Sequence, residues 1–279
     1  MVTRRGWLST ASARLMEAGC EDAAFDARCL LEDLGGLPRG HAADDTLLTA
    51  DQQSNLDTAL AEREAGRPLQ YILGEWEFLT LTLKVGEGVL IPRPDTELLC
   101  EAAAARLAGK PAPRVLDLCA GSGCVGLGVA SLCPYAVVTE VELSDDAWPY
   151  LTDNIARYPA YDVTALQANV LTDYNTFEGP YDAILSNPPY IPTADLAGLQ
   201  REVHHEPQMA LDGAEDGLLF YRTIAEHWCD KLAPDGFVAV EVGIGQATDV
   251  AALFAAKGLE NTEVLTDLGD VQRVVIARK

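Results

Sequence analysis

Residues 115–126 read VLDLCAGSGCVG, and this stretch decides the fold of the chain. An apolar run of strand length leads into a glycine-rich turn, and the start of a helix follows. Glycines let a ligand approach the backbone closely, and a helix that begins at the turn offers unpaired N–H groups. Dinucleotide enzymes cradle a pyrophosphate with this geometry, so residues 115–126 predict the first strand, turn and helix of a ligand-binding α/β domain.

The sequence beyond residue 113 alternates strand and helix signals, which favours a mostly parallel sheet covered by helices on both faces. The last two predicted strands are separated only by residues 267–270, short enough for a hairpin, so the final strand is expected to be antiparallel. We therefore predict an α/β, Rossmann-like domain with a seven-stranded sheet. Its strands are predicted at 114–118, 136–141, 163–168, 181–186, 237–242, 261–266 and 271–277.

The sequence before this domain is helical in character. Apolar residues recur at helical spacing from Trp7 onward, GGLP at 35–38 ends the second helix, and Thr49 is a candidate N-cap of the third. RPLQYILG at 67–74 breaks the pattern, and β-forming residues follow it. We predict a small N-terminal helical bundle at 1–70, a linking β-hairpin at 71–92 and the α/β domain at 93–279.

Composition restricts the class of protein. Hydrophobic residues make up 48% of the 279 residues, enough for a packed core. No apolar run approaches the roughly 20 residues of a membrane span, and the two N-terminal arginines precede no apolar signal segment. The sequence predicts a cytoplasmic protein without a membrane partner. The seven cysteines include no Cys-x-x-Cys pair and the four histidines add no ligand pattern, so reduced thiols and no metal site are expected.

The net charge of −23 comes from 43 acidic and 20 basic residues. Such a surface repels phosphate backbones, so direct nucleic-acid binding is not expected. A basic protein partner and a salt-rich cytoplasm are both compatible with this charge, which does not choose between them.

Polar residues stand where the first three of these strands end. Asp117 precedes the glycine turn and suits a cation, such as the amino group of a methionine moiety, better than a diphosphate. Glu142 ends the second strand, where a carboxylate typically holds ribose hydroxyls, and is favoured over Glu140 because it is nearer the strand end. After the third strand, Asn169 is placed to bind an adenine amine, and Val170 to pack on its ring. Together these residues predict a nucleoside-like cofactor laid across the sheet.

The fourth predicted strand ends in SNPPYI at 186–191. Two consecutive prolines fix a rigid, extended corner, so the carbonyl groups of Asn187 and Pro188 can accept hydrogen bonds from a ligand. Tyr190 adds a flat ring beside them. This corner is the predicted reaction centre.

Two further segments are candidates. Arg93 lies between Pro92 and Pro94, ahead of a helix that Asp95 or Thr96 is expected to cap. A cap explains the acid and the hydroxyl but not Arg93, which we treat as a candidate site residue. Residues 206–217 either close part of the active site or simply connect two strands; the sequence leaves both open.

These motifs together resemble the release-factor glutamine methyltransferase family (the HemK/PrmC type), which uses S-adenosylmethionine. The resemblance is collinear over nearly the whole chain. Its stretches are RPLQYILG at 67–74, IPRPDTE at 91–97, DLCAGSG at 117–123, SNPPYI at 186–191, EPQMALDG at 206–213, DGL at 216–218 and EVG at 241–243. Two positions depart from the family pattern: Cys119 replaces the usual first glycine, and Asn169 stands where aspartate is common.

The resemblance implies transfer of a methyl group from S-adenosylmethionine to the side-chain amide nitrogen of the glutamine in the Gly-Gly-Gln motif of peptide chain release factors. It implies a monomeric enzyme. The sequence leaves two roles open for the helical domain, a structural cap and the recognition of this protein substrate, and we assign it to substrate recognition. The implied catalytic residues are Asn187, Pro188 and Tyr190. The cofactor-binding residues are Asp117, Cys119, Ala120, Gly121, Ser122, Gly123, Glu142, Asn169, Val170 and Asn187, and the substrate-binding residues are Asn187, Pro188, Pro189, Tyr190 and Arg93.

Three other functions remain alternatives. A DNA adenine-N6 methyltransferase can carry the same motif at the fourth strand, but the acidity and the lack of a basic stripe count against it. A non-catalytic adaptor that keeps the cofactor fold has no use for an intact corner at 187–190. A nicotinamide oxidoreductase would share the glycine spacing, but it leaves Asp117 and the corner without a role.

Overall fold

The computed structural model describes residues 2–36 and 44–279 and divides them into two compact units. The helical unit comprises the described residues up to Glu75 together with Gln200–His205. The sheet unit comprises Trp76–Leu199 and Glu206–Lys279. Of the turn predicted at 35–38, positions 37 and 38 lie outside the described residues.

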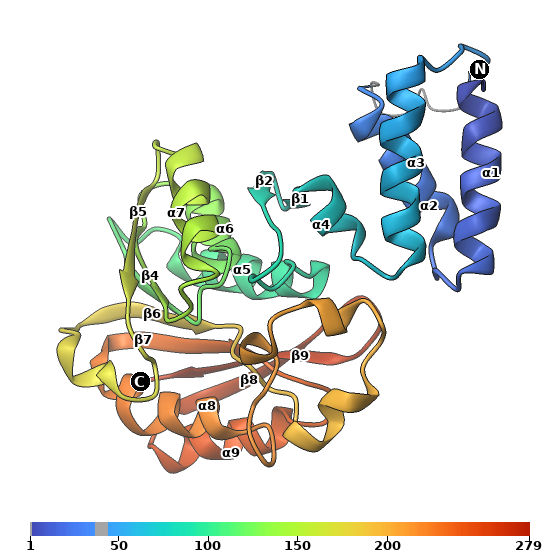
Figure 1. Cartoon of the computed structure of the whole chain (residues 1–279). Coiled ribbons are helices and arrows are strands. Elements are labelled where there is room, and N and C mark those ends of the chain that lie inside the picture. Colours follow the sequence, from blue (N-terminus) through green and yellow to red (C-terminus); the bar gives the residue numbers. More distant parts are fainter. Residues whose placement is uncertain (1, 37–43) are drawn as a thin grey trace. The chain divides into compact units, whose positions relative to one another are not determined.

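In the helical unit, the helices at Arg4–Glu17, Ala23–Cys29 and Ala50–Glu64 lie side by side (Figure 1). Trp7, Leu15, Leu30, Leu56 and Leu60 are buried among them, as the helical spacing of apolar residues predicts. Its helical elements are α1 (Arg4–Glu17), α2 (Ala23–Cys29) with a π-helical continuation (Leu30–Leu34), α3 (Ala50–Glu64) and α4 (Leu69–Leu73).

The start of α3 is fixed by a capping box. Thr49 Oγ1 accepts the Gln52 N–H at 3.2 Å, and Gln52 Oε1 accepts the Thr49 N–H at 3.1 Å. Two N–H groups that the helix cannot satisfy internally are thereby paired, which confirms the predicted N-cap.

The segment Gln200–His205 belongs to the helical unit through a buried charge cluster. Arg63 Nε donates to Asp26 at 2.7 Å, and Arg63 Nη1 donates to Glu202 at 3.0 Å. Arg201 also donates to the Glu64 carbonyl at 3.2 Å. The sequence places no such segment in the helical bundle, because the contacts of Glu202 with Arg63 and of Arg201 with Glu64 join residues more than 130 positions apart.

The predicted hairpin is formed by β1 (Glu75–Phe78) and β2 (Leu81–Lys84), and β2 packs within the sheet unit. The Lys84 N–H donates to Asn154 Oδ1 at 2.6 Å, and the Thr82 N–H donates to Tyr158 Oη at 2.7 Å. Asn154 Nδ2 also donates to the Ser122 carbonyl at 2.9 Å, so it ties the hairpin to the glycine turn.

The large sheet has seven strands in the order β5-β4-β3-β6-β7-β9-β8. The first five are parallel, and β9 is antiparallel to both of its neighbours, which confirms the prediction for the final strand. The strands are β3 (Arg114–Leu118), β4 (Val137–Glu142), β5 (Asp162–Gln167), β6 (Tyr181–Ser186), β7 (Leu232–Glu241), β8 (Glu260–Thr266) and β9 (Gln272–Arg278).

Alternating side chains of the strands enter two separate cores. Val115 and Ala183 pack with Leu99 and Leu127 of helices α5 and α6, and their neighbours Leu116 and Ile184 belong to the core that contains Phe254 of α9. Figure 1 shows helices on both faces of the sheet. The helices of this unit are α5 (Pro94–Leu107), α6 (Cys124–Leu132), α7 (Trp148–Arg157), α8 (Leu219–Thr223) with a π-helical continuation (Ile224–Trp228), and α9 (Ala247–Ala256); short 3₁₀ turns lie at Asp173–Thr176, Thr193–Gly198, Val203–His205, Gln208–Ala210 and Cys229–Lys231.

The parallel strands all end at one edge, which brings together the residues that follow β3, β4, β5 and β6.

Within residues 2–36 and 44–279, no helix combines the length and apolar character needed to cross a membrane. The seven cysteines are free thiols.

Candidate active site

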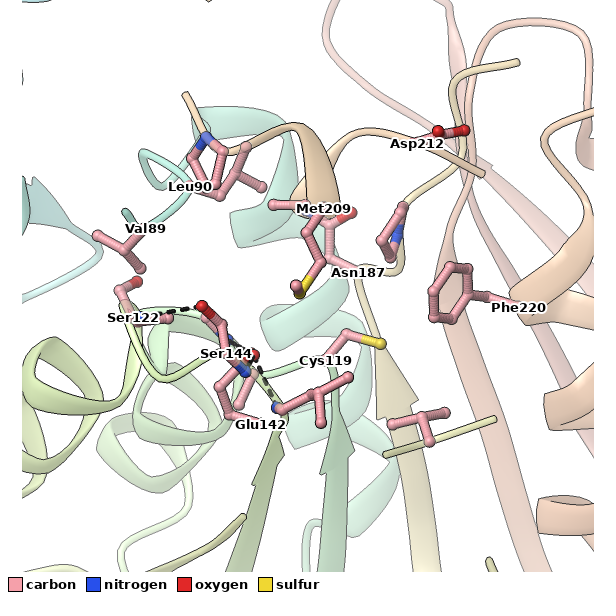
Figure 2. Close-up of a pocket in the computed structure, with 18 of the residues that line it drawn as sticks. Val89, Leu90, Cys119, Ser122, Glu142, Ser144, Asn187, Met209, Asp212 and Phe220 are labelled. Atoms are coloured by element: carbon pink, nitrogen blue, oxygen red, sulfur yellow. Dashed lines mark hydrogen bonds between the residues drawn. The ribbon is translucent and has the colours of Figure 1, made fainter. Parts of the chain in front are cut away.

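A cavity of about 480 Å³ lies at this edge of the sheet. It is lined by the glycine turn after β3, the ends of β4 and β5, the corner after β6 and residues 88–93. Figure 2 shows Cys119, Ser122 and Glu142 on one side of it and Asn187, Met209 and Phe220 on another. Its size and its mostly apolar lining are typical of a small-ligand site.

The glycine turn follows β3 in three left-handed residues: Cys119 has φ 61°, Gly121 φ 57° and Gly123 φ 82°. A side chain at Gly121 would meet only Val89, at 3.9 Å, so the backbone there is open to the cavity. Ser122 lines the cavity with a buried hydroxyl that has no partner among the described residues. Gly123 itself does not line the cavity; it precedes α6 as its N-cap residue.

The Glu142 carboxylate is held at the cavity wall by three backbone N–H groups. Oε2 accepts the N–H of Gly121 at 2.8 Å, and Oε1 accepts those of Leu143 and Ser144 at 2.8 and 2.7 Å. The preference for Glu142 over Glu140 therefore agrees with the geometry: Glu142 lines the cavity and Glu140 is fully buried beneath the turn.

The sequence suggests that Asp117 faces a cationic ligand, but the structure places it beneath the glycine turn. It is fully buried, does not line the cavity, and accepts the Gly126 N–H through Oδ2 at 3.0 Å. Burial, opposed by a hydrogen bond with Glu140, raises the pKa of Asp117 to about 7, and burial beside Asp117 raises the pKa of Glu140 well above its usual value. The two carboxyl groups therefore share a proton beneath the turn, and Asp117 supports the turn from a position that does not line the cavity.

Asn169 and Val170 line the cavity after β5, as predicted. Asn169 Oδ1 accepts the Leu171 N–H at 2.9 Å, and the Asn169 N–H donates to Asp173 at 2.9 Å. Asn169 Oδ1 thus carries one backbone hydrogen bond and keeps a second lone pair, and Nδ2 has no hydrogen-bond partner among the described residues. The Val170 side chain is buried, and its carbonyl accepts the indole N–H of Trp228 at 3.0 Å.

The corner after β6 is rigidly supported. Ser186 donates to the Leu118 carbonyl at 2.6 Å, which joins the ends of β6 and β3. Asn187 and Pro189 line the cavity. The buried Pro188 and the partly buried Tyr190 are not among the residues that line it. Gln246 Nε2 donates to the Tyr190 carbonyl at 2.9 Å. Burial, followed by the Glu241 charge, raises the pKa of Tyr190 to about 12, so its phenol stays protonated.

The Asn187 amide is fixed from behind by a chain of hydrogen bonds. Asn187 Nδ2 donates to Thr96 Oγ1 at 3.1 Å, and Thr96 Oγ1 donates to Glu241 Oε2 at 2.5 Å. Thr96 is therefore not the cap that the sequence suggests, and neither is Asp95: α5 begins at Pro94, its N-cap is Arg93, and no side chain caps it.

Arg93 lines the cavity and forms an ion pair with the buried Glu206. Glu206 also accepts the Ile91 N–H at 3.0 Å, so it joins the segment before α5 to residues 206–217. That loop contributes Met209, Asp212 and others to the cavity wall. The sequence left open whether it closes part of the active site or simply connects two strands, and its place beside the cavity agrees with the first role. Hydrogen bonds of 2.9 and 2.8 Å pair Ile191 with Leu211 and Gly213.

Sequence reasoning missed three residues of this site: Thr96, Glu206 and Glu241. All three stand in stretches quoted above as matching the family, and Glu241 is a carboxylate within a run of apolar strand residues. That placement is a usable signal, because an ionisable group buried at the end of a parallel strand is costly unless it has a specific partner.

The cavity fits S-adenosylmethionine on the evidence of its own atoms. It offers an orphaned Ser122 hydroxyl, an open backbone at Gly121 and the Glu142 carboxylate on its wall. When bound, this cofactor supplies an electrophilic methyl group on a sulfonium centre. The fold and the site define an S-adenosylmethionine-dependent methyltransferase.

Comparison with known proteins narrows this class. Residues 6–74 match the model of the PrmC N-terminal domain, and residues 94–208 match that of the methyltransferase small domain. The release factor glutamine methyltransferase of Rhodospirillum rubrum is 41% identical over 270 residues, which cover 95% of this chain and 82% of that protein. The one from Geobacter sulfurreducens is 39% identical over 267 residues, with coverage of 95% and 92%. The chain belongs to the release factor glutamine methyltransferase family.

A solved methyltransferase structure from Pyrococcus furiosus is similar in fold alone. It is 17% identical, has a TM-score of 0.53, and covers 83% of this chain and 99% of its own. The Rossmann-like prediction, with a helical N-terminal region, is confirmed.

Proposed function

We propose that this chain methylates the side-chain amide nitrogen of the glutamine in the Gly-Gly-Gln motif of peptide chain release factors, and so acts on translation termination in the cytoplasm. The observation that carries the proposal is the Asn187 amide, whose Nδ2 is engaged by Thr96 while no hydrogen bond among the described residues is accepted by its Oδ1. A free amide oxygen at a rigid corner is an acceptor suited to one N–H of a planar primary amide.

The Pro188 carbonyl is proposed as the acceptor for the second N–H. An amide nitrogen is a weak nucleophile, because its lone pair is delocalised into the carbonyl, so it needs orientation more than a strong base. Two fixed acceptors direct the nitrogen into the cavity, and such positioning lowers a barrier by about 7–11 kcal/mol. Tyr190, neutral because its pKa is raised to about 12, packs against the substrate side chain with Pro189. The extra proton leaves to solvent after transfer.

The other predicted site residues take supporting roles in this proposal. Glu142 and the turn 119–123 hold the cofactor, with Asn169 and Val170 beside its adenine. Arg93, paired with Glu206, borders the entry of the substrate segment. The helical unit recognises the body of the release factor, and the enzyme works as a monomer with no nucleic-acid partner.

The test is incubation with labelled S-adenosylmethionine and purified release factor, with duplex DNA in parallel. Label on the glutamine of the Gly-Gly-Gln motif, located by mass spectrometry, is the expected result. Label on adenine in the DNA alone would replace the proposal with the DNA methyltransferase alternative. Cofactor binding without any transfer would favour the adaptor.

A further inference from the structure

The chain Asn187–Thr96–Glu241 joins three elements of the sheet unit: the corner after β6, the first turn of α5 and the end of β7. Thr96 is fully buried and Glu241 is 2% exposed. The Glu241 backbone is itself fixed, because its carbonyl accepts the Tyr221 hydroxyl at 2.8 Å. Burying a hydroxyl and a carboxyl group is costly unless they are hydrogen-bonded, so the pairing of Thr96 with Glu241 calls for an explanation.

The hydrogen-bond inventory of the three groups provides one. A threonine hydroxyl carries a single hydrogen, and an ionised carboxylate only accepts. When Glu241 is ionised, the Thr96 hydrogen points to Glu241, so Thr96 Oγ1 can only accept from Asn187. The group that Asn187 turns toward Thr96 must then be Nδ2, and the amide oxygen faces the other way.

We propose that Thr96 and Glu241 are positioning residues that set the polarity of the Asn187 amide, so that its oxygen and not its NH₂ group meets the substrate amide. The inference rests on the proposed function, because it needs an N–H donor as the substrate. This chain of hydrogen bonds from Glu241 through Thr96 to Asn187, here called the relay, acts through Asn187 and touches no reacting atom.

Protonation of Glu241 on Oε2, the oxygen that Thr96 contacts, reverses the relay. The carboxylic acid then donates to Thr96 Oγ1, and the Thr96 hydrogen turns toward Asn187. The acceptor it requires is Oδ1, so the amide rotates by about half a turn and presents NH₂ to the substrate. Two donors then face each other, and one of the two bonds that orient the substrate nitrogen is lost.

The surroundings of Glu241 place this reversal in an accessible range of pH. Burial is the main cause that raises the pKa of Glu241 to about 7, and the Thr96 hydrogen bond opposes it. The Glu241 carboxylate is therefore formed as pH rises through about 7, and turnover rises with it. The charged and titratable groups around Glu241 are Asp95, Arg93, Arg273, Tyr190, Tyr221, Cys100 and Cys124.

The experiment compares Thr96→Val, which keeps the shape and removes the hydroxyl, with Thr96→Ser, which keeps the hydroxyl. Thr152→Val is the matched control, since among the described residues the Thr152 hydroxyl bonds only within its own helix, to the Trp148 and Pro149 carbonyls. We measure kcat and KM for release factor from pH 5.5 to 9, with cofactor affinity and melting temperature for each variant. Thr96→Val is expected to lower kcat on the order of 10²-fold with little change in cofactor affinity.

Two further results are expected from the relay and not from a packing role. The wild-type kcat shows an inflection near pH 7 that Thr96→Val lacks, and Thr96→Ser recovers most of the lost turnover. Glu241→Gln, which cannot ionise, also loses the inflection, and it provides the test if Thr96→Val does not fold. An unchanged inflection in Glu241→Gln, or wild-type kcat in a folded Thr96→Val, overturns the relay.

The two hypotheses fail in different ways. If the wild-type protein transfers no methyl group to release factor at any pH, the proposed function is wrong. If the wild-type protein is active but its pH profile and kcat are insensitive to these variants, only the relay is wrong.

Discussion

Glu142 Oε2 accepts the Gly121 N–H at 2.8 Å, so the end of β4 and the glycine turn after β3 form one structure. The same carboxylate also holds the N–H groups of Leu143 and Ser144. A ligand that engages Glu142 therefore meets a group already oriented by the backbone, and no side-chain freedom is lost on binding.

Substitution Glu142→Ala removes an acceptor from three N–H groups and a carboxylate from the cavity wall. Hydrogen bonds to a charged group contribute about 1.5–3 kcal/mol each, so loss of the cofactor's bond raises its Kd by about 10- to 100-fold. Isothermal titration with S-adenosylmethionine measures this. Asp146→Ala is the control, because Asp146 is an exposed carboxylate on the same loop. Equal affinities for the two variants would remove Glu142 from the cofactor site.

Substitution Asn187→Ala removes the free amide oxygen while it leaves the glycine turn and Glu142 intact. We expect kcat to fall by about 10²–10³-fold, the usual effect of deleting one orienting group in an active site, while cofactor binding largely survives. Single-turnover assays with release factor, together with cofactor titration, separate the two quantities. The exposed Asn175→Ala serves as the control. Turnover of Asn187→Ala at the wild-type level contradicts the role given to this corner.

The sheet could be predicted because its signals are local. The bounds of β3 and β6 agree with the predicted strands, since each is a short, mostly apolar run that a turn signal ends. The glycine turn follows Leu118, and the Asn-Pro-Pro corner follows Ser186. β7 begins five residues earlier than predicted, at Leu232. The sequence LAPDG at 232–236 is typical of a turn, but in the structure Leu232 pairs with Tyr181 of β6 and so joins the sheet.

The candidate site was predicted mainly where its residues stand at or just after the ends of strands, and Arg93 was recognised by its two flanking prolines. Glu142, Asn169 and Asn187 stand at such strand ends, and the structure brings them to one cavity. The Thr96–Glu241 contact joins residues 145 positions apart, and the burial of Asp117 depends on Glu140 of the next strand. Such contacts depend on the order and register of the strands, and no local pattern in the sequence predicts either.

Substitution Glu140→Gln tests the buried carboxyl pair through stability. The pKa values of Asp117 and Glu140 are raised in the folded state. Between the pKa values of the unfolded chain and about pH 7, the native protein therefore holds protons that the unfolded chain has released. Stability therefore falls as pH rises from about 4 through about 7. Glutamine keeps a donor for Asp117 and removes one titration, so the variant should be more stable at pH 8 by about 1–3 kcal/mol.

Urea unfolding at pH 5.5 and pH 8 measures this difference. Glu101→Gln, at an exposed position of α5, is the control for loss of one negative charge. The buried pair is contradicted if Glu140→Gln and Glu101→Gln show the same pH dependence.

Cys119, which replaces the usual glycine of the family, adopts a backbone conformation that is strained for a residue with a side chain. Its φ of 61° is left-handed, a conformation that costs a residue with a Cβ about 1–2 kcal/mol. Cys119→Gly relieves this cost, and the greater freedom of glycine in the unfolded chain offsets part of the gain. We expect a net stabilisation of about 0.5–1 kcal/mol. Cys133→Gly is the matched comparison, because Cys133 is buried with φ −130° and has no strain to relieve, so it should be destabilised. Thermal melts of both variants decide the matter, and a destabilised Cys119→Gly shows that the thiol's packing in the cavity wall outweighs the backbone strain.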